Sequence, residues 1–255
     1  MIHQTAIVSP TAKIHESVEI GPYSIIEDDV VIGEGSIIGS HVQLASGARL
    51  GKNVKVFQGA VIGTVPQDLK FGGEITQANI GDSTVIREYV TVNRGTNESG
   101  STDVGPNCLL MAYSHVAHDC KIANNVILAN SVNLAGHIHI DEHAIIGGVV
   151  PVHQFVHIGA HSMIGGGFRV PQDVCPFSLL GGYPLKVMGL NIVGLRRRGF
   201  SREAIGVLQN VFKLLFFSDL NTKQAVEKIE ATMERTPEVV TILDFIAAST
   251  RGLAK

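Results

Sequence analysis

The stretch VEIGPYSIIEDDVVIGEGSIIGS, residues 18–40, repeats one pattern every six residues. Ile20, Ile26, Ile32 and Ile38 stand six positions apart, and each is followed four positions later by a small or β-branched residue. A fixed short period of this kind is typical of a solenoid, in which each coil stacks its inward side chains on the equivalent side chains of the next coil. The stretch therefore predicts a parallel β-solenoid.

The same period extends over most of the chain. Every sixth residue is Ile, Leu or Val from Ile2 to Ile62, from Ile80 to Val92, and from Val104 to Ile164. The two interruptions, 66–78 and 97–102, are expected to be loops that leave the solenoid. With three six-residue units per coil, residues eighteen apart lie on the same face of neighbouring coils, about 4.8 Å apart along the axis. Residues 1–175 are therefore expected to form one solenoid domain.

Beyond residue 175 the pattern changes twice. Residues 176–195 contain two prolines and several glycines, so we expect an irregular connector. Residues 196–255 have apolar residues at helical spacing, with Ser201 as the N-cap of a first helix, Asn221 or Thr222 as the cap of a second, and Thr236-Pro237 at the start of a third. The expected fold class is an all-β solenoid with a C-terminal α-helical domain.

Composition excludes several classes of protein. The chain of 255 residues has a formal net charge of −3 and a pI near 6.4, which argues against a nucleic-acid binder. It has no apolar run of about 20 residues and no secretory leader pattern, so we expect no stable membrane insertion. Its odd number of cysteines, Cys108, Cys120 and Cys175, fits reduced thiols in a cytoplasmic protein.

Polar residues gather unexpectedly in MAYSHVAHDC, residues 111–120. The six-residue units of Val116, Leu134 and Val152 are spaced by eighteen, so their histidines, His118, His137 and His153, are expected to lie together on one face. Both interruptions leave from the corner that follows this face, which brings the first loop, with Asp68 and Lys70, close to the histidines.

Two chemistries suit this cluster. Imidazole is a common zinc ligand, and a neutral imidazole oriented by an adjacent carboxylate, as in His118-Asp119, is a good general base near pH 7. We favour the base and expect no metal. The run Arg196-Arg197-Arg198 is a candidate phosphate clamp, because guanidinium groups match the geometry of phosphate oxygens.

Six motifs carry a resemblance that covers essentially the whole chain. QDLK (67–70), NRGT (93–96), HVAHDC (115–120), LAGH (134–137), VHQF (152–155) and GLRRRGFSREAI (194–205) occur in this order, and the chain resembles the UDP-N-acetylglucosamine O-acyltransferases. The resemblance implies a left-handed β-helix, whereas the general crossover rule would favour the right hand. It also implies a homotrimer that moves a 3-hydroxyacyl group from acyl carrier protein to the glucosamine 3-hydroxyl of UDP-N-acetylglucosamine, the first step of lipid A synthesis. No cofactor is implied beyond the phosphopantetheine of the carrier protein.

The resemblance also assigns roles to residues. It implies that His118 is the catalytic base, that Asp119 orients it, and that the Gly136 N–H stabilises the oxyanion. The position that ends the acyl pocket falls on Gly166, and Val193 stands where family members often have Glu. The implied substrate-binding residues are Asp68, Lys70, His115, His137, His153, Gln154, Gly166, Asn191, Arg197 and Arg198.

Other functions stay open at this point. The same site would serve an N-acyltransferase that acts on a 3-amino sugar nucleotide. The lipid A N-acyltransferase is less favoured, since the repeat begins at residue 2 with no uridine-binding domain before it. A solenoid metalloenzyme of the carbonic anhydrase type would use the histidines as ligands, and a non-catalytic scaffold would not use them at all.

Overall fold

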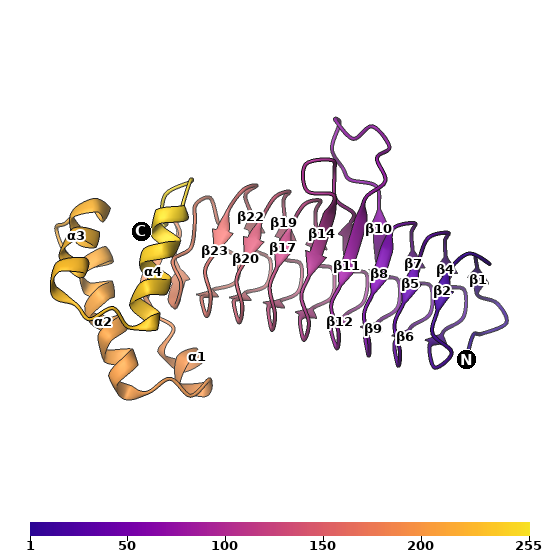
Figure 1. Ribbon diagram of the computed structural model, residues 1–255, viewed down its shortest axis with the longest axis horizontal. Helices are drawn as coiled ribbons and strands as arrows, with labels where there is room; N and C mark the ends of the chain where they lie inside the picture. Colours follow the sequence, from indigo (N-terminus) through magenta and orange to yellow (C-terminus); the bar gives the residue numbers. More distant parts are fainter.

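The computed structural model describes residues 1–255 and has the shape of a long three-sided prism with helices at its C-terminal end (Figure 1). Each side of the prism is one sheet whose strands are contributed by successive coils. Most strands have only two residues, because the chain turns a corner after each of them. The prediction of a solenoid from the six-residue period is confirmed.

We number the sheets as faces 1, 2 and 3 in the order in which the chain visits them. Face 1 contains β1 (Ile7–Val8), β4 (Ile25–Ile26), β7 (Gln43–Leu44), β10 (Val61–Thr64), β13 (Thr91–Asn93), β16 (His115–Val116), β19 (Asn133–Leu134) and β22 (Pro151–Val152). Face 2 contains β2 (Lys13–Ile14), β5 (Val31–Ile32), β8 (Ala48–Leu50), β11 (Gln77–Ile80), β14 (Ser101–Val104), β17 (Lys121–Ile122), β20 (His139–Ile140) and β23 (His157–Ile158).

Face 3 ends in a hairpin. It contains β3 (Glu19–Ile20), β6 (Ile37–Ile38), β9 (Lys55–Val56), β12 (Val85–Ile86), β15 (Leu109–Leu110), β18 (Ile127–Leu128), β21 (Ile145–Ile146), β24 (Met163–Ile164), β25 (Ser178–Gly181) and β26 (Lys186–Leu190). The strands β25 and β26 are antiparallel, and all other pairs are parallel. The segment 176–195, for which we expect irregular structure, is therefore mostly a hairpin that extends face 3, and its last residues begin a helix.

Strand register follows the eighteen-residue spacing. Val116 pairs with Leu134, and Leu134 pairs with Val152, one coil further along. Where a loop is inserted the strands are longer, so both loops begin and end earlier in the chain than the sequence indicates. The first loop spans residues 65–76 and the second spans residues 94–100, because the remaining residues of each interruption belong to β11 and β14.

The interior of the prism is filled by the repeated aliphatic residues. Ile26, Ile38, Leu44 and Ile62 are each at most 1% exposed, and the small residues four positions after each aliphatic are buried beside them. Burying such a side chain contributes roughly 1.5–3 kcal/mol, so the stacked rows are the main source of stability. All three cysteines are buried free thiols in this packing.

The corners impose an unusual backbone conformation. Seventeen residues other than glycine have a positive φ, and they recur at the second residue of the corner turns. Asp119 (φ 60°) and His137 (φ 61°) occupy this position in neighbouring coils, between faces 1 and 2. Residues in this region are strained unless the surroundings hold them. The repeat therefore fixes the backbone of both polar residues before any side-chain contact is considered.

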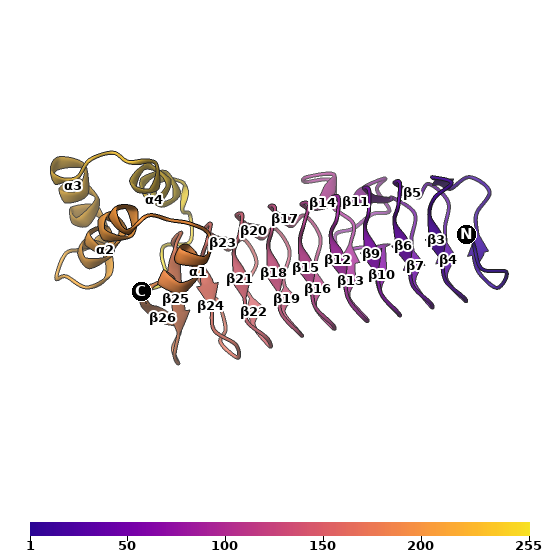
Figure 2. The same cartoon turned by 90° about the horizontal axis from the view of Figure 1, so that it is seen from below.

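Helices cover the C-terminal end of the prism (Figure 2). They are α1 (Ile192–Arg197), α2 (Arg202–Phe216), α3 (Thr222–Thr232) and α4 (Pro237–Ala248). Ser201 and Thr236 are N-caps as predicted, and of the two candidates for α3 the cap is Asn221, which forms a capping box with Gln224. The short helix α1, capped by Asn191, precedes the three predicted helices and was not predicted. No helix is both long and apolar enough to cross a membrane.

A stack of rings joins the prism to the helices. His161 stacks on His143 with ring centroids 4.9 Å apart and on Phe177 at 5.7 Å, and it meets Phe200 edge-on at 5.0 Å. Burial, with the positive charges of His143 and Arg198, lowers the pKa of His161 to about 4. The ring is therefore held in its neutral form inside an apolar contact.

This stack should make stability depend on pH. The pKa of His161 is lowered in the folded state from 6.5 to about 4, so only the unfolded chain gains this proton between these values. The stabilisation is present above about pH 6.5 and is lost as the pH falls through 4, by up to roughly 3 kcal/mol. Replacing His161 with Phe should keep the stack and reduce the fall in melting temperature between pH 7 and pH 4. An unchanged fall would show that other groups control acid stability.

Candidate active site

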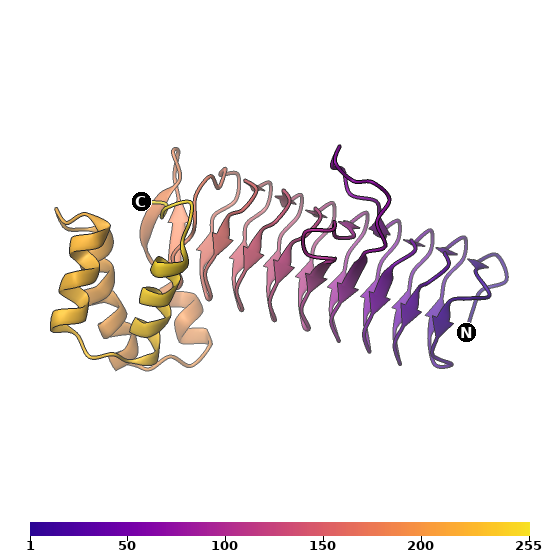
Figure 3. The ribbon, with the colours of Figure 1, turned by 45° about the horizontal axis from the view of Figure 1, so that its top comes forward.

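The corner between faces 1 and 2 is where both loops leave the prism (Figure 3). Loop 65–76 connects β10 to β11, and loop 94–100 connects β13 to β14, so they project side by side above the same corner. Together with the next coils they enclose an open hollow of about 690 Å³. Among the residues that line it are Asp68, Lys70, His118, His137 and Gln154. The expected proximity of the first loop to the histidines is thus confirmed.

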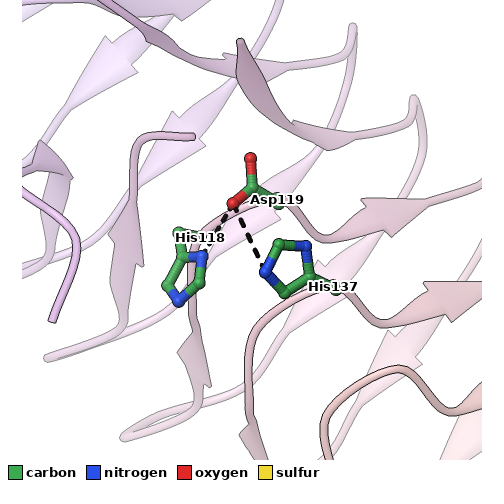
Figure 4. A group of neighbouring side chains, drawn as sticks. All are labelled: His118, Asp119 and His137. Carbon is green, nitrogen blue, oxygen red and sulfur yellow. Dashed lines mark hydrogen bonds and ion pairs between the residues drawn. The ribbon is translucent and has the colours of Figure 1, made fainter. Parts of the chain in front are cut away.

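His118, Asp119 and His137 form the polar centre of this hollow (Figure 4). The Nδ1 atom of His118 lies 2.7 Å from Oδ2 of Asp119, and the same oxygen is 3.8 Å from Nε2 of His137. The two imidazole rings meet edge-on with centroids 5.0 Å apart. The His118 side chain is 12% exposed and the Asp119 side chain 1% exposed. Because Asp119 occupies Nδ1, the Nε2 atom of His118 remains for a ligand.

The Asp119 carboxylate is buried but fully engaged. Oδ1 accepts hydrogen bonds from the Thr96 N–H (2.9 Å) and the Ser99 hydroxyl, and Oδ2 accepts from the Thr96 hydroxyl (2.8 Å) as well as from His118. Burial acts to raise the pKa of Asp119, but these hydrogen bonds outweigh it and lower the pKa to about 2. Asp119 is therefore an anion at neutral pH.

Gly136 lies directly against the imidazole of His118. A Cβ atom at this position would be 2.6 Å from Cε1 and 2.8 Å from Nε2 of His118, so only glycine leaves room for the ring. Its buried N–H donates no hydrogen bond within the protein, whereas its carbonyl accepts one from the N–H of Phe155. This N–H is therefore available to a ligand at the residue that packs against the His118 ring.

His137 is fixed from two sides. Its ring stacks on Phe155, with centroids 4.6 Å apart and planes 10° from parallel. The carboxylate of Glu98, on the second loop, is 3.7 Å from Nε2. The ring consequently presents one edge to Asp119 and the hollow, which is compatible with a substrate contact.

His115 lies beside this centre on β16. Its Nδ1 atom is 2.7 Å from the Thr91 hydroxyl on the neighbouring strand. Burial, with the nearby His118, lowers the pKa of His115 and favours its neutral form. His115 is therefore a hydrogen-bonding group for this region of face 1.

His153 does not line the hollow with His118 and His137. His118, Gly136 and Gln154 are equivalent turn residues in successive coils, as are Asp119, His137 and Phe155. His153 precedes this turn by one residue, and its Nδ1 atom is 3.1 Å from the Gln154 carbonyl. His118 and His137 belong to the turn itself and converge, with ring centroids 5.0 Å apart, whereas His153 lies before the turn.

The two loops are joined above the hollow. The Asn97 side chain donates to Oε1 of Glu74 at 3.1 Å, and Oε2 of Glu74 accepts from the Gly72 N–H. Asp68 accepts from the Lys70 N–H and is half-buried, while the Lys70 side chain is exposed. The loop thereby holds a carboxylate and an ammonium group at the hollow that His118 also lines.

A second group of predicted residues lies elsewhere on the chain. Gly166 turns at the corner between faces 3 and 1. Asn191 and Arg197 line a mostly apolar cleft of about 360 Å³ on face 3. The Asn191 amide is used within the protein, since it caps α1 and donates to the His161 carbonyl. Arg198 is half-buried at the end of α1, and burial lowers its pKa. None of these four residues lines the hollow that contains His118.

The polar centre also has the donor set of a metal site. One ligand atom from each of His118, Asp119 and His137 falls within 4.8 Å of the others. However, both Asp119 oxygens already accept two hydrogen bonds each, and Nδ1 of His118 is one of the donors. A metal would have to displace these bonds, so the residues fit a hydrogen-bonded base better than a zinc ligand set.

Removal of metal ions should therefore leave the protein active. We expect dialysis against a chelator to change the turnover rate by less than twofold, with no stoichiometric zinc in the untreated protein by elemental analysis. Loss of activity on chelation and its return with zinc would change the role of His118 from base to ligand.

Sequence reasoning missed several residues in and around the hollow. Thr96 and Ser99, which contact Asp119, and Glu98, which contacts His137, come from the second loop, to which the sequence assigned no role. Phe155, the stacking partner of His137, was a recognisable signal, because it stands eighteen residues after His137.

Known proteins match this chain over its whole length. The family described as Udp N-acetylglucosamine O-acyltransferase, domain 2, matches residues 173–254, and the bacterial transferase hexapeptide repeat matches residues 11–46 and 101–136. An acyl-[acyl-carrier-protein]–UDP-N-acetylglucosamine O-acyltransferase of Thermodesulfovibrio yellowstonii is 47% identical over 255 residues, covering 100% of this chain and 99% of its relative.

Solved structures give the same result. A UDP-N-acetylglucosamine acyltransferase of Bacteroides fragilis superposes with a TM-score of 0.99 at 47% identity over 100% of both chains. The Acinetobacter baumannii protein LpxA gives 0.96 at 41% identity, over 100% of this chain and 99% of that one. The predicted fold class, a left-handed parallel β-helix with a C-terminal helical domain, is confirmed. Matched from end to end by these relatives, the chain belongs to the UDP-N-acetylglucosamine O-acyltransferase family.

Proposed function

We propose that this protein transfers a 3-hydroxyacyl group from acyl carrier protein to the 3-hydroxyl of UDP-N-acetylglucosamine, the first step of lipid A synthesis. The observation that carries the proposal is the full-length match, at 47% identity, to a relative named for this reaction. The His118–Asp119 pair in an open hollow beside an unpaired N–H supports it independently. The water-soluble carrier and nucleotide sugar make the cytoplasm the expected location.

In the proposed mechanism His118 is the general base. Asp119 holds the proton on Nδ1, so Nε2 is free to take the proton of the acceptor hydroxyl as its oxygen attacks the thioester carbon. The carbonyl oxygen gains negative charge, and the Gly136 N–H is the donor available to stabilise it. The tetrahedral intermediate then breaks the carbon–sulfur bond, and the imidazolium returns the proton to the leaving thiolate. No cofactor takes part beyond the phosphopantetheine that carries the acyl group.

The site fits either of two reacting groups on the acceptor, a 3-hydroxyl group or a 3-amino group. A 3-amino group could use the same base and the same oxyanion donor. Purified protein should be given 3-hydroxyacyl carrier protein with either UDP-N-acetylglucosamine or its 3-amino analogue, and the products identified by mass spectrometry. We expect the 3-hydroxyl acceptor to have the higher kcat/KM. A preference for the amine would make the protein an N-acyltransferase, and transfer to neither would overturn the proposal.

We further propose that the protein works as a homotrimer. The hollow at the corner between faces 1 and 2 is open to solvent, and Gly166, Asn191 and Arg197 belong to other parts of the surface. In a closed threefold arrangement the face 3 region of one copy would cover the hollow of the next. The two groups of residues would then form one site between two copies.

Mixed trimers should test this arrangement. His118→Ala and Arg197→Ala copies should each be nearly inactive alone, because each removes one half of every site. Co-expressed in equal amounts they should give mixed trimers that recover about a third of the wild-type activity, since every trimer that contains both kinds of copy joins two intact halves at one of its three interfaces. Recovery should be measured on trimers purified with two different affinity tags. No recovery would mean that both residues act within a single copy.

A further inference from the structure

Loop 94–100 holds the Asp119 carboxylate by hydrogen bonds from Thr96 and Ser99. The Thr96 main chain and hydroxyl, together with the Ser99 hydroxyl, supply three of the four hydrogen bonds to the carboxylate. The main-chain N–H of Asp119 in turn donates to the Thr102 hydroxyl at 2.8 Å, just beyond the loop. The carboxylate is thus enclosed by this one segment, with His118 as the remaining donor.

We propose that Thr96 and Ser99 are positioning residues for the reaction, because their hydroxyl groups hold the Asp119 carboxylate in the orientation that fixes the His118 imidazole. The inference rests on the proposed function, in which His118 is the base. It gives a role to the second inserted loop, and it extends the His118–Asp119 pair to a four-residue network.

The fold by itself does not require this loop. The next coils pass the same corner with a two-residue turn, as His118-Asp119 and Gly136-His137 do. The loop nevertheless folds back so that Thr96 is only 8% exposed against the carboxylate. An insertion that the repeat does not need, and whose hydroxyl groups converge on one catalytic carboxylate, is better explained by the chemistry than by the stability of the coil.

The hydroxyl groups of Thr96 and Ser99 differ in how they hold the Asp119 carboxylate. Thr96 contributes its N–H and its hydroxyl, one to each carboxylate oxygen, and so fixes both the position and the plane of the group. Ser99 has one proton, and the Ser101 carbonyl at 2.8 Å competes for it with the carboxylate. The charged acceptor is the stronger of the two. The Thr96 hydroxyl, however, binds Oδ2, the oxygen that also binds Nδ1 of His118, so its loss should have the larger effect on the imidazole.

Several charged groups share this region. His118 and His137 face Asp119 directly, and Glu98 faces His137 from the loop. Asp68, Lys70 and Glu74 line the same hollow from the first loop. These groups stay in place when a hydroxyl is removed. The carboxylate then loses a donor that favours its charged form, and it binds the protonated imidazole more strongly. The acid limb of the pH–rate profile should therefore move to higher pH.

The test compares variants of the full-length protein. Thr96→Val keeps the N–H and the shape but removes the hydroxyl, and we expect kcat to fall about tenfold with KM for the nucleotide sugar unchanged. The acid limb should move to higher pH, and Thr96→Ser should restore both values. Ser99→Ala should lower kcat about threefold. A matched control is Thr84→Val, which removes a buried hydroxyl that donates to the Gly105 carbonyl between faces 2 and 3 and should leave kcat and the profile unchanged.

A second measurement does not depend on turnover. The hydrogen-bonded Nδ1 proton of His118 should give a low-field NMR resonance, identified by its absence in His118→Ala, and Thr96→Val should shift or broaden it. If Thr96→Val changes the resonance but the wild-type protein transfers no acyl group, the proposed function is contradicted and the network still stands. Wild-type kcat, pH profile and resonance in Thr96→Val would overturn the inference.

Discussion

Replacing His118 with Ala should lower the rate of acyl transfer by at least two orders of magnitude. Loss of a general base typically costs 10²–10⁴-fold, and no other group is placed to substitute well. His115 is the nearest candidate, but its Nδ1 atom is engaged by Thr91. The His137 ring is held between Phe155 and the Asp119 carboxylate. The expected change is in kcat, since the variant removes an interaction with the reacting proton.

The control for this variant is binding. The His118 side chain lies outside the interior rows, so the variant should keep its melting temperature and its affinity for UDP-N-acetylglucosamine, measured by calorimetry. Asp119→Ala should cost less, because it removes orientation and charge but leaves an imidazole. If His118→Ala keeps more than a tenth of the wild-type rate, the base lies elsewhere.

Gly136→Ala should lower the rate of acyl transfer nearly as much, because the added methyl group would displace the His118 ring. The added Cβ would stand 2.6 Å from Cε1 and 2.8 Å from Nε2 of His118, closer than van der Waals contact allows. The backbone accepts alanine at this position, since its φ is not in the left-handed region. The imidazole must therefore move, which breaks its bond to Asp119 and covers the atom left for the acceptor. We expect a loss of roughly 10²-fold in kcat, with the order of magnitude set by loss of the base.

Two further variants check this explanation. Gly206→Ala on α2 adds the same atom where nothing lies within 4 Å, and should leave the rate unchanged. The double variant with His118→Ala should be no worse than His118→Ala alone, because both changes act on one ring. Full activity in Gly136→Ala would mean that the ring position is not critical.

The fold could be predicted from the sequence because each coil repeats the same six-residue pattern. Because an aliphatic residue recurs at every sixth position, Ile26 and Ile38 face the interior of the prism regardless of the rest of the chain. The end of the prism could not be predicted, because the 176–190 hairpin lacks the six-residue period. Its strand β25 pairs in parallel with β24, and β26 pairs antiparallel with β25. Its glycines and prolines indicated turns but not which edge they would cover.

The site was readable only where it follows the repeat. His118 and Asp119 are adjacent, and Gly136 and His137 stand eighteen residues further on, so their proximity follows from the coil length. His153 stands one residue before the turn and does not line the hollow, which the eighteen-residue spacing alone did not reveal. Thr96 and Ser99 could not be found in this way, since the conformation of their loop depends on the carboxylate that they contact.

The central claim is that an imidazole at this corner takes the acceptor's proton, and chemical rescue tests it most directly. In His118→Ala the hollow stays open to solvent, and Gly136 leaves space where the ring was. Added imidazole should restore acyl transfer in proportion to its concentration, and a series of substituted imidazoles should rescue more strongly as their basicity rises. The same additives should not change the wild-type rate. A His118→Ala protein that binds both substrates but responds to none of these bases would contradict the claim.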